Sequence, residues 1–117
     1  MARATKLITI NTESGRDNGK VFLVTEPNAF IGEKLFNQAF SLCGEDVTPQ
    51  SLMMKTTTKE GRELWESLLY LVKYVPNPND ISTARKIDQT GDDIEDISTV
   101  IRLRGEALSM IVNFTEE

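Results

Sequence analysis

Apolar and polar residues alternate in two short stretches near the start of the chain. In residues 5–11, Ile8 and Ile10 face the side opposite to their polar neighbours, and residues 20–25 are rich in β-branched and aromatic side chains. These patterns predict β-strands. Residues 17–19 (Asp-Asn-Gly) form a turn signal between them, because Asn and Gly tolerate positive φ. We therefore predict an N-terminal β-hairpin, which must pack on helices because two strands alone are marginally stable.

The rest of the chain carries apolar residues at the three-to-four-residue spacing of amphipathic helices. This spacing predicts helices at residues 27–43, 49–55, 57–74 and 92–112, of which the second is short. The predicted starting signals are Pro27, Thr48-Pro49, the capping-box pair Thr57 and Glu60, and the similar pair Thr90 and Asp93. Each predicted helix therefore has a local signal that marks where it begins.

The last predicted helix, residues 92–112, is the longest and spans roughly 30 Å. Its apolar stripe is formed by Ile94, Ile97, Ile101, Leu108 and Ile111. The acidic residues 92, 93, 95 and 96 are expected in its first turn, where negative charge stabilises the positive end of the helix dipole. Gly105 costs about 1 kcal/mol relative to Ala in mid-helix, so we expect it to mark a close approach of another backbone. We expect the shorter upstream elements to pack on this helix.

One segment has two interpretations. Val72–Val75 either completes the third helix, or is extended and pairs with a short edge strand within residues 82–87, beyond the proline-containing residues 76–80. In both cases the fold class is α+β, with an N-terminal β-hairpin packed on a small bundle of three main helices plus one short helix. The 117 residues are predicted to form a single domain (1–117), with the hairpin in residues 1–26 and a mainly helical part in residues 27–117.

The negative charge of the chain is concentrated toward its end. The net charge of −5 is located entirely in residues 77–117, because acidic and basic side chains balance in residues 1–76. This distribution argues against a basic groove, so we expect no nucleic-acid partner. No apolar run approaches the ~20 residues that cross a bilayer, and the N-terminus lacks the apolar core of a signal peptide. We therefore expect a cytoplasmic protein without a membrane partner.

Patterns that would indicate catalysis or ligand binding are weak. The chain contains no histidine, and its one cysteine, Cys43, lies in an apolar run that is typical of a buried thiol. Residues 15–21 lack the glycine spacing and the Ser or Thr of a phosphate-binding loop. Residues 88–99 carry Asp93 and Thr99 at the sixth and twelfth positions, where a calcium-binding loop needs glycine and glutamate. Glu63 and Glu66 are paired carboxylates that could serve acid–base chemistry, but they share the polar face of a predicted helix, which favours a solvated surface. We therefore expect a non-enzymatic protein without metal or cofactor.

Three apolar residues are candidates for contact with a protein partner. Aromatic residues cover more than one face of the first predicted helix, and a core needs one face, so Phe30 is a candidate. Met110 and Phe114, near the C-terminus, are two further candidates for contact with a partner. The competing interpretation for each is ordinary core packing. The wide stripe of the last helix also leaves open that a second copy of the chain pairs with it as a homo-oligomer.

Two stretches carry a family resemblance: residues 15–29 (GRDNGKVFLVTEPNA) and residues 92–114 (DDIEDISTVIRLRGEALSMIVNF). Together they resemble small tailed-bacteriophage proteins, the tail assembly chaperones. In that family a Gly-Arg-Asp-x-Gly-Lys loop leads into a strand that ends near Thr-Glu, and an Asp-Ile-Glu-x-Ile/Val-Ser-Thr segment leads into a late helix. The chain departs from this pattern where Pro27 follows Glu26 without the expected Met, and where Gly105 replaces a larger helix-former.

The resemblance implies a protein that takes part in virion morphogenesis in the host cell cytoplasm and is absent from the finished virion. The implied partner is the phage tape measure protein, with the major tail protein as a second candidate. Such a chaperone would cover long apolar helices until tail subunits replace it. The alternative is a minor structural virion component, such as a tail completion or connector protein. An enzyme is the third hypothesis, against which the absence of histidine argues.

Overall fold

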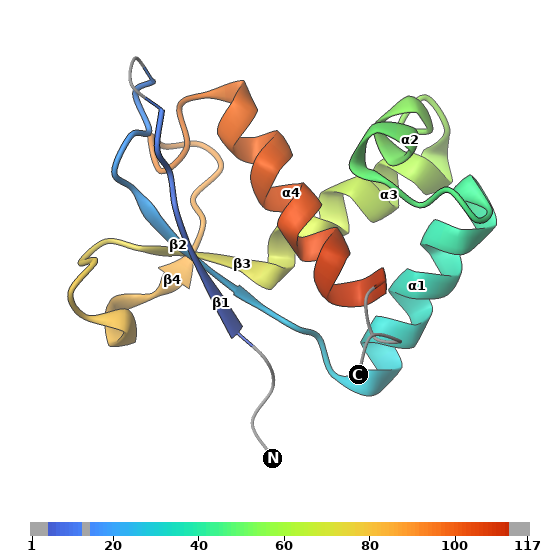
Figure 1. The fold of residues 1–117 in the computed structure, drawn as a ribbon, viewed down its shortest axis with the longest axis horizontal. Helices are drawn as coiled ribbons and strands as arrows, with labels where there is room; N and C mark the ends of the chain where they lie inside the picture. Colours follow the sequence, from blue (N-terminus) through green and yellow to red (C-terminus); the bar gives the residue numbers. More distant parts are fainter. Residues whose placement is uncertain (1–4, 13–14, 113–117) are drawn as a thin grey trace.

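The computed structural model describes residues 5–12 and 15–112, which form the predicted α+β fold (Figure 1). Its strands are β1 (Thr5–Thr9), β2 (Val21–Thr25), β3 (Val72–Val75) and β4 (Arg85–Lys86). Its helices are α1 (Ala29–Cys43), α2 (Pro49–Met54), α3 (Lys59–Leu68) and α4 (Ile97–Val112). Short 3-10 turns occupy Leu69–Leu71 and Ile81–Thr83. The predicted hairpin, the three longer helices and the short helix are confirmed.

The sheet has the order β1-β2-β3-β4, and all neighbouring strands are antiparallel. Val72–Val75 is extended and pairs with β2 on one side and β4 on the other. The extended interpretation is therefore correct, and a third helix that reaches residue 74 is wrong. The reason is tertiary, because Phe22 and Val24 place β2 in the core, where its backbone groups need partners on both sides. β-Branched Val72 and Val75 suit such a buried pairing.

Two helices begin one or two residues later than predicted. The side chain of Asn28 caps α1 by accepting a hydrogen bond from a first-turn backbone N–H, which leaves Pro27 just outside the helix. Thr58, rather than Thr57, caps α3. Thr48 caps α2, as predicted. The Thr cap of α2 was therefore predicted correctly, the Thr cap of α3 was predicted one residue early, and the Asn28 cap of α1 was missed.

The largest difference concerns α4, which begins at Ile97 instead of residue 92. Residues 88–96 form a loop in which Thr90 donates hydrogen bonds to the carboxylate of Asp88 instead of capping a helix. The acidic residues of this loop precede α4, so their predicted position in its first turn is wrong. The reason is a distant acceptor, because backbone N–H groups of the loop donate to Asp17 in the hairpin.

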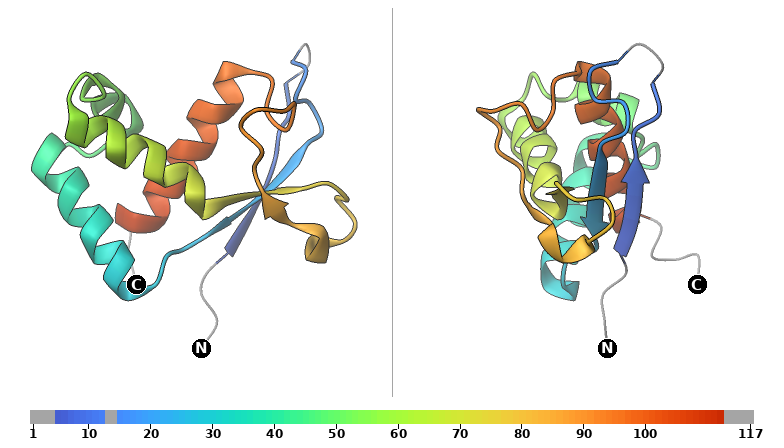
Figure 2. Two further views of the ribbon diagram at one scale, coloured as in Figure 1. Left: turned by 180° about the vertical axis from the view of Figure 1, so that it is seen from behind. Right: turned by 90° about the vertical axis from the view of Figure 1, so that its left-hand side faces the viewer.

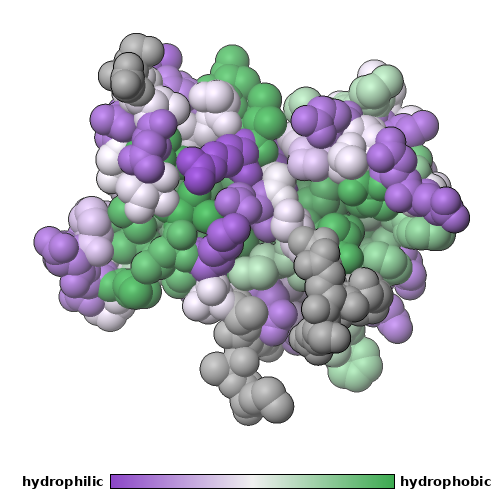
Figure 3. Space-filling view, viewed as in Figure 1, coloured by the Kyte–Doolittle hydropathy of each residue, from purple (hydrophilic) through white to green (hydrophobic). Residues whose placement is uncertain are grey.

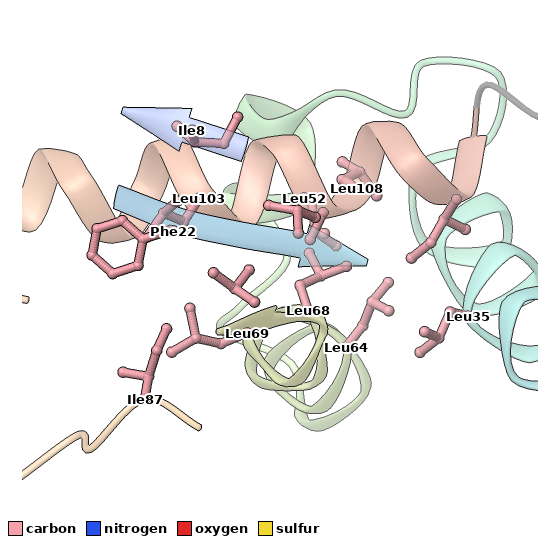
Figure 4. Packing of buried hydrophobic residues seen from close by; sticks show 14 of the residues in the cluster. Ile8, Phe22, Leu35, Leu52, Leu64, Leu68, Leu69, Ile87, Leu103 and Leu108 are labelled. Atoms are coloured by element: carbon pink, nitrogen blue, oxygen red, sulfur yellow. The ribbon is translucent and has the colours of Figure 1, made fainter. Parts of the chain in front are cut away.

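The core lies where the sheet and the helices meet. α4 lies between the sheet and the group formed by α1, α2 and α3, as the views from front, back and side show (Figures 1 and 2). Phe22 of β2, Leu103 of α4 and Leu64 of α3 contribute to one buried cluster (Figure 4). Ile97, predicted in the apolar stripe of the last helix, is 79% exposed. The later start of α4 therefore changes which apolar residues reach the core.

Gly105 marks a close approach, although not to another backbone as expected. A Cβ atom at this position would lie 3.2 Å from Cγ of Pro49, in the first turn of α2. The small residue therefore allows α4 to pack directly against a proline ring.

Candidate functional site

The two ends of α4 have different surroundings. Near its N-terminal end, hairpin residues 15–20 meet residues 88–96 through hydrogen bonds and ion pairs. We call the side chains of Asp17, Lys20, Arg85 and Asp93, with the backbone of residues 92–96, the polar clasp. Near its C-terminal end, α4 and α1 border an apolar hollow, which we call the α1–α4 groove. Each region is a candidate functional site.

Asp17 is the centre of the polar clasp, and its side chain is fully buried. Its carboxylate accepts hydrogen bonds from the backbone N–H groups of Glu95 (2.9 Å) and Asp96 (2.8 Å) and from Nζ of Lys20 (2.9 Å). Burial by itself raises the pKa of Asp17, but these hydrogen bonds outweigh it and lower the pKa to about 2. The buried carboxylate therefore stays ionised and holds the hairpin loop to the entry of α4.

Lys20 and Asp93 extend the same network. Nζ of Lys20 also donates to the backbone carbonyls of Asp92 (2.7 Å) and Asp93 (3.1 Å). The carboxylate of Asp93 accepts two hydrogen bonds from the guanidinium of Arg85, both of 2.8 Å. These bonds lower the pKa of Asp93, and burial opposes them. Each charged group thus faces an opposite charge or backbone groups that satisfy it.

Gly15 lets the two loops approach each other. A Cβ atom at this position would lie 2.8 Å from Oδ2 of Asp96 and would also overlap Thr12. Oδ2 of Asp96 is occupied by a hydrogen bond from the backbone N–H of Asp17 (2.9 Å), so it has little freedom to move. The glycine and acidic residues that suggested a phosphate loop or a calcium loop are therefore used for packing between two segments distant in sequence.

The clasp offers little that could act on a ligand. In the described part of the chain, no group of three or more Cys, Asp or Glu side chains is arranged to hold a metal ion. The carboxylates of Asp17 and Asp93 are both engaged by cations and by backbone N–H groups. The geometry therefore assigns the clasp to the stability of the fold.

The α1–α4 groove has a different chemistry. It has a volume of about 480 Å³ and runs along the first half of α1, opposite the end of α4. Its described lining consists of Glu26, Pro27, Asn28, Ala29, Gly32, Glu33, Phe36, Asn37, Met110 and Ile111. On the face seen in Figure 3, apolar side chains gather between α4 and α1. A concave surface with an apolar floor and a few polar groups at its border is typical of binding sites.

The predicted contact residues fall in and beside this groove. Phe30, in the first turn of α1, is 85% exposed, although it does not line the groove as its neighbour Ala29 does. Met110 is half-buried, packs against the core and lines the groove. Phe114 lies outside the described residues. The structure thus places Phe30 and Met110 on the two helices that border one groove.

Other exposed apolar residues escaped the sequence prediction. Met54 is 78% exposed in α2, and Tyr70 is 67% exposed beyond α3. Tyr70 lines a wider hollow of about 760 Å³ between α1 and α3, which also carries Lys34, Lys73, Glu63 and Glu66. Cys43 is half-buried at the edge of the core rather than fully buried. Periodicity alone did not reveal these exposures, because it does not show where a neighbouring helix ends.

Comparison with protein-family models, curated proteins and solved structures finds no match for this chain. In the described residues, none of the helices combines the length and the apolar character needed to cross a membrane. The functional interpretation therefore depends on the site geometry and on the resemblance of residues 15–29 and 92–114.

Proposed function

We propose that this chain is a non-enzymatic phage tail assembly chaperone that binds the tape measure protein in the host cytoplasm, with the major tail protein as a second partner. The observation that carries the proposal is the apolar surface at the start of α1. Phe30 is almost fully exposed there, beside a groove that has an apolar floor. Large exposed apolar side chains next to a groove are typical of protein-binding surfaces.

A second observation supports the proposal. The two stretches that carry the family resemblance are far apart in sequence, yet residues 15–20 and 92–96 contact each other in the polar clasp. A shared loop-to-loop contact gives a physical reason for both motifs to occur in the same protein. Because the clasp is occupied internally, the partner-binding role falls to the opposite end of α4.

The test is co-purification of the full chain with the tape measure protein of its own phage. We expect a complex that survives several salt concentrations and is weakened by Phe30→Asp. The matched control is Met54→Asp, which places the same charge at a similarly exposed apolar residue of another helix. Absence of any complex with the unmodified chain at all salt concentrations would overturn the proposal.

Mass spectrometry of purified virions separates the chaperone from the structural alternative. A chaperone acts during assembly and leaves, so we expect the chain to be absent from finished particles. Its presence there at a copy number comparable with other minor tail proteins would favour a tail completion or connector protein instead.

A further inference from the structure

We infer that the α1–α4 groove binds an amphipathic helix of a partner protein whose apolar stripe is bordered by Lys or Arg. The identification of this helix with a segment of the tape measure protein rests on the proposed function. The recognition of a helix with basic borders rests on the groove alone, through its shape, its walls and its charge.

The walls favour a helix over an extended strand. Both long walls are helices, and the described lining includes no residue of the sheet. A strand binds by adding to a sheet edge, which supplies free backbone donors and acceptors. The side chains of α1 and α4 can instead interdigitate with the apolar stripe of a third helix.

The size of the groove matches a short helical contact. Its lining runs from Asn28 to Asn37 along α1, which corresponds to roughly 13 Å, or about two and a half helical turns. Three apolar side chains at positions i, i+3 or i+4, and i+7 span such a length. Met110, at the floor, has an unbranched side chain that adapts to different apolar shapes.

The charge of the groove selects the borders of the partner helix. Glu33 supplies an exposed carboxylate at the border of the groove, Glu26 already interacts within the chain, and none of the described lining residues is Lys or Arg. Glu33 is exposed, so its carboxylate is accessible to a cation of a partner. Basic residues beside the apolar stripe would complement this border, and acidic residues would be repelled by it.

The same charge argues against a second copy of the chain as the occupant. A second copy of the chain docked symmetrically would bring acidic borders together, and each chain has a net charge of −5. A partner with basic borders avoids this repulsion.

The test uses two labelled helical peptides of about 15 residues. They share one leucine stripe and differ only in Lys or Glu at its borders. Fluorescence anisotropy measures their binding to the full chain. We expect the Lys peptide to bind roughly three- to tenfold more tightly than the Glu peptide, with a difference that shrinks at high salt. Failure of the Lys peptide to bind, or equal binding of both peptides, would overturn the inference.

Two pairs of variants locate the contact. Met110→Asp should weaken the Lys peptide at least roughly tenfold, whereas the matched Met54→Asp should leave it unchanged. Since Met110 also touches the core, Glu33→Lys provides a variant that leaves the core intact and should reverse the preference between the peptides. Its matched control is Glu45→Lys, at an exposed residue outside the groove. Unchanged binding by Glu33→Lys would overturn the inference.

The other occupants produce different results. If Phe114→Ala increases peptide affinity about tenfold or more, the end of the same chain occupies the groove. If the chain sediments as a dimer that Met110→Asp dissociates, a second copy does. Either result overturns the inference. Peptide binding without tape measure binding would overturn the proposed function alone, and tape measure binding without peptide binding would overturn the inference alone.

Discussion

The polar clasp and the α1–α4 groove lie at opposite ends of α4, separated by roughly 24 Å along its 16 residues. In the clasp, charged groups meet partners within the chain, and the buried carboxylate of Asp17 accepts hydrogen bonds from Lys20 and from the backbone. In the groove, apolar side chains line an accessible hollow and Glu33 is exposed. The polar clasp, which has the more recognisable sequence motif, thus stabilises the fold. The α1–α4 groove, which has the weaker sequence signal, is the candidate for binding.

The largest effect on stability is expected from Asp17→Ala. This change leaves the backbone N–H groups of Glu95 and Asp96 without their acceptor and removes one partner of Lys20. The loss should be about 3–5 kcal/mol, because a buried ion pair is broken from one side. Urea denaturation measures it. The control is Asp92→Ala, at an exposed acidic residue in the same segment, which should change stability by less than about 0.5 kcal/mol. Equal effects would remove the distinction between clasp and surface.

Acid should weaken the clasp. The pKa of Asp17 is about 2 in the folded chain and 3.8 as its ordinary value, so the folded state binds fewer protons between these values. The stability that Asp17 contributes is therefore present above about pH 5 and lost as the pH falls toward 2. The loss is on the order of 2 kcal/mol, and the lowered pKa of Asp93 acts in the same direction.

The measurement is the free energy of unfolding as a function of pH. Asp17→Asn should have a shallower pH dependence than the unmodified chain between about pH 5 and pH 2. A variant with an unchanged slope would show that Asp17 is not the group responsible.

Replacing a glycine by alanine should change the stability of the protein in opposite directions in the clasp and at the groove. Gly15→Ala places Cβ against Asp96 and should destabilise the fold by about 1–3 kcal/mol. Gly32→Ala, at the groove, meets only Cγ of Pro27 at 3.4 Å, an ordinary contact, and should stabilise α1 by up to about 1 kcal/mol. Thermal unfolding of both variants measures the difference. Similar melting temperatures would contradict the close packing of the clasp.

The smallest effect on stability is expected from Phe30→Ser. Because Phe30 is 85% exposed, its loss removes little buried area and should change the free energy of unfolding by less than about 0.5 kcal/mol. The same variant should weaken binding of the partner. A large loss of stability would instead mean that Phe30 packs within the protein, and the proposed surface would lose its main support.

The sequence by itself determined the features that depend on near neighbours. The alternation around Ile8, the turn at Gly19 (φ 88°) and the caps near the helix starts gave an α+β fold with a hairpin and the correct number of helices. It also named Phe30 as a candidate for partner contact, because one face of the first helix is enough for a core, and Phe30 is exposed. These outcomes follow from local backbone preferences and from the period of the side chains.

Only the tertiary structure decided where distant segments meet. Val72–Val75 is a strand because β2 needs a second partner, and residues 92–96 are a loop because Asp17 supplies an acceptor for their backbone N–H groups. No local pattern contains this information, since the residues that supply the bonds are distant in sequence, as in the pairing of Val24 with Val72 and the hydrogen bond from Glu95 to Asp17. The groove likewise depends on tertiary structure, because residues near the start of α1 and the end of α4, which are distant in sequence, line it together. We infer its partner from the charge at its border rather than from periodicity.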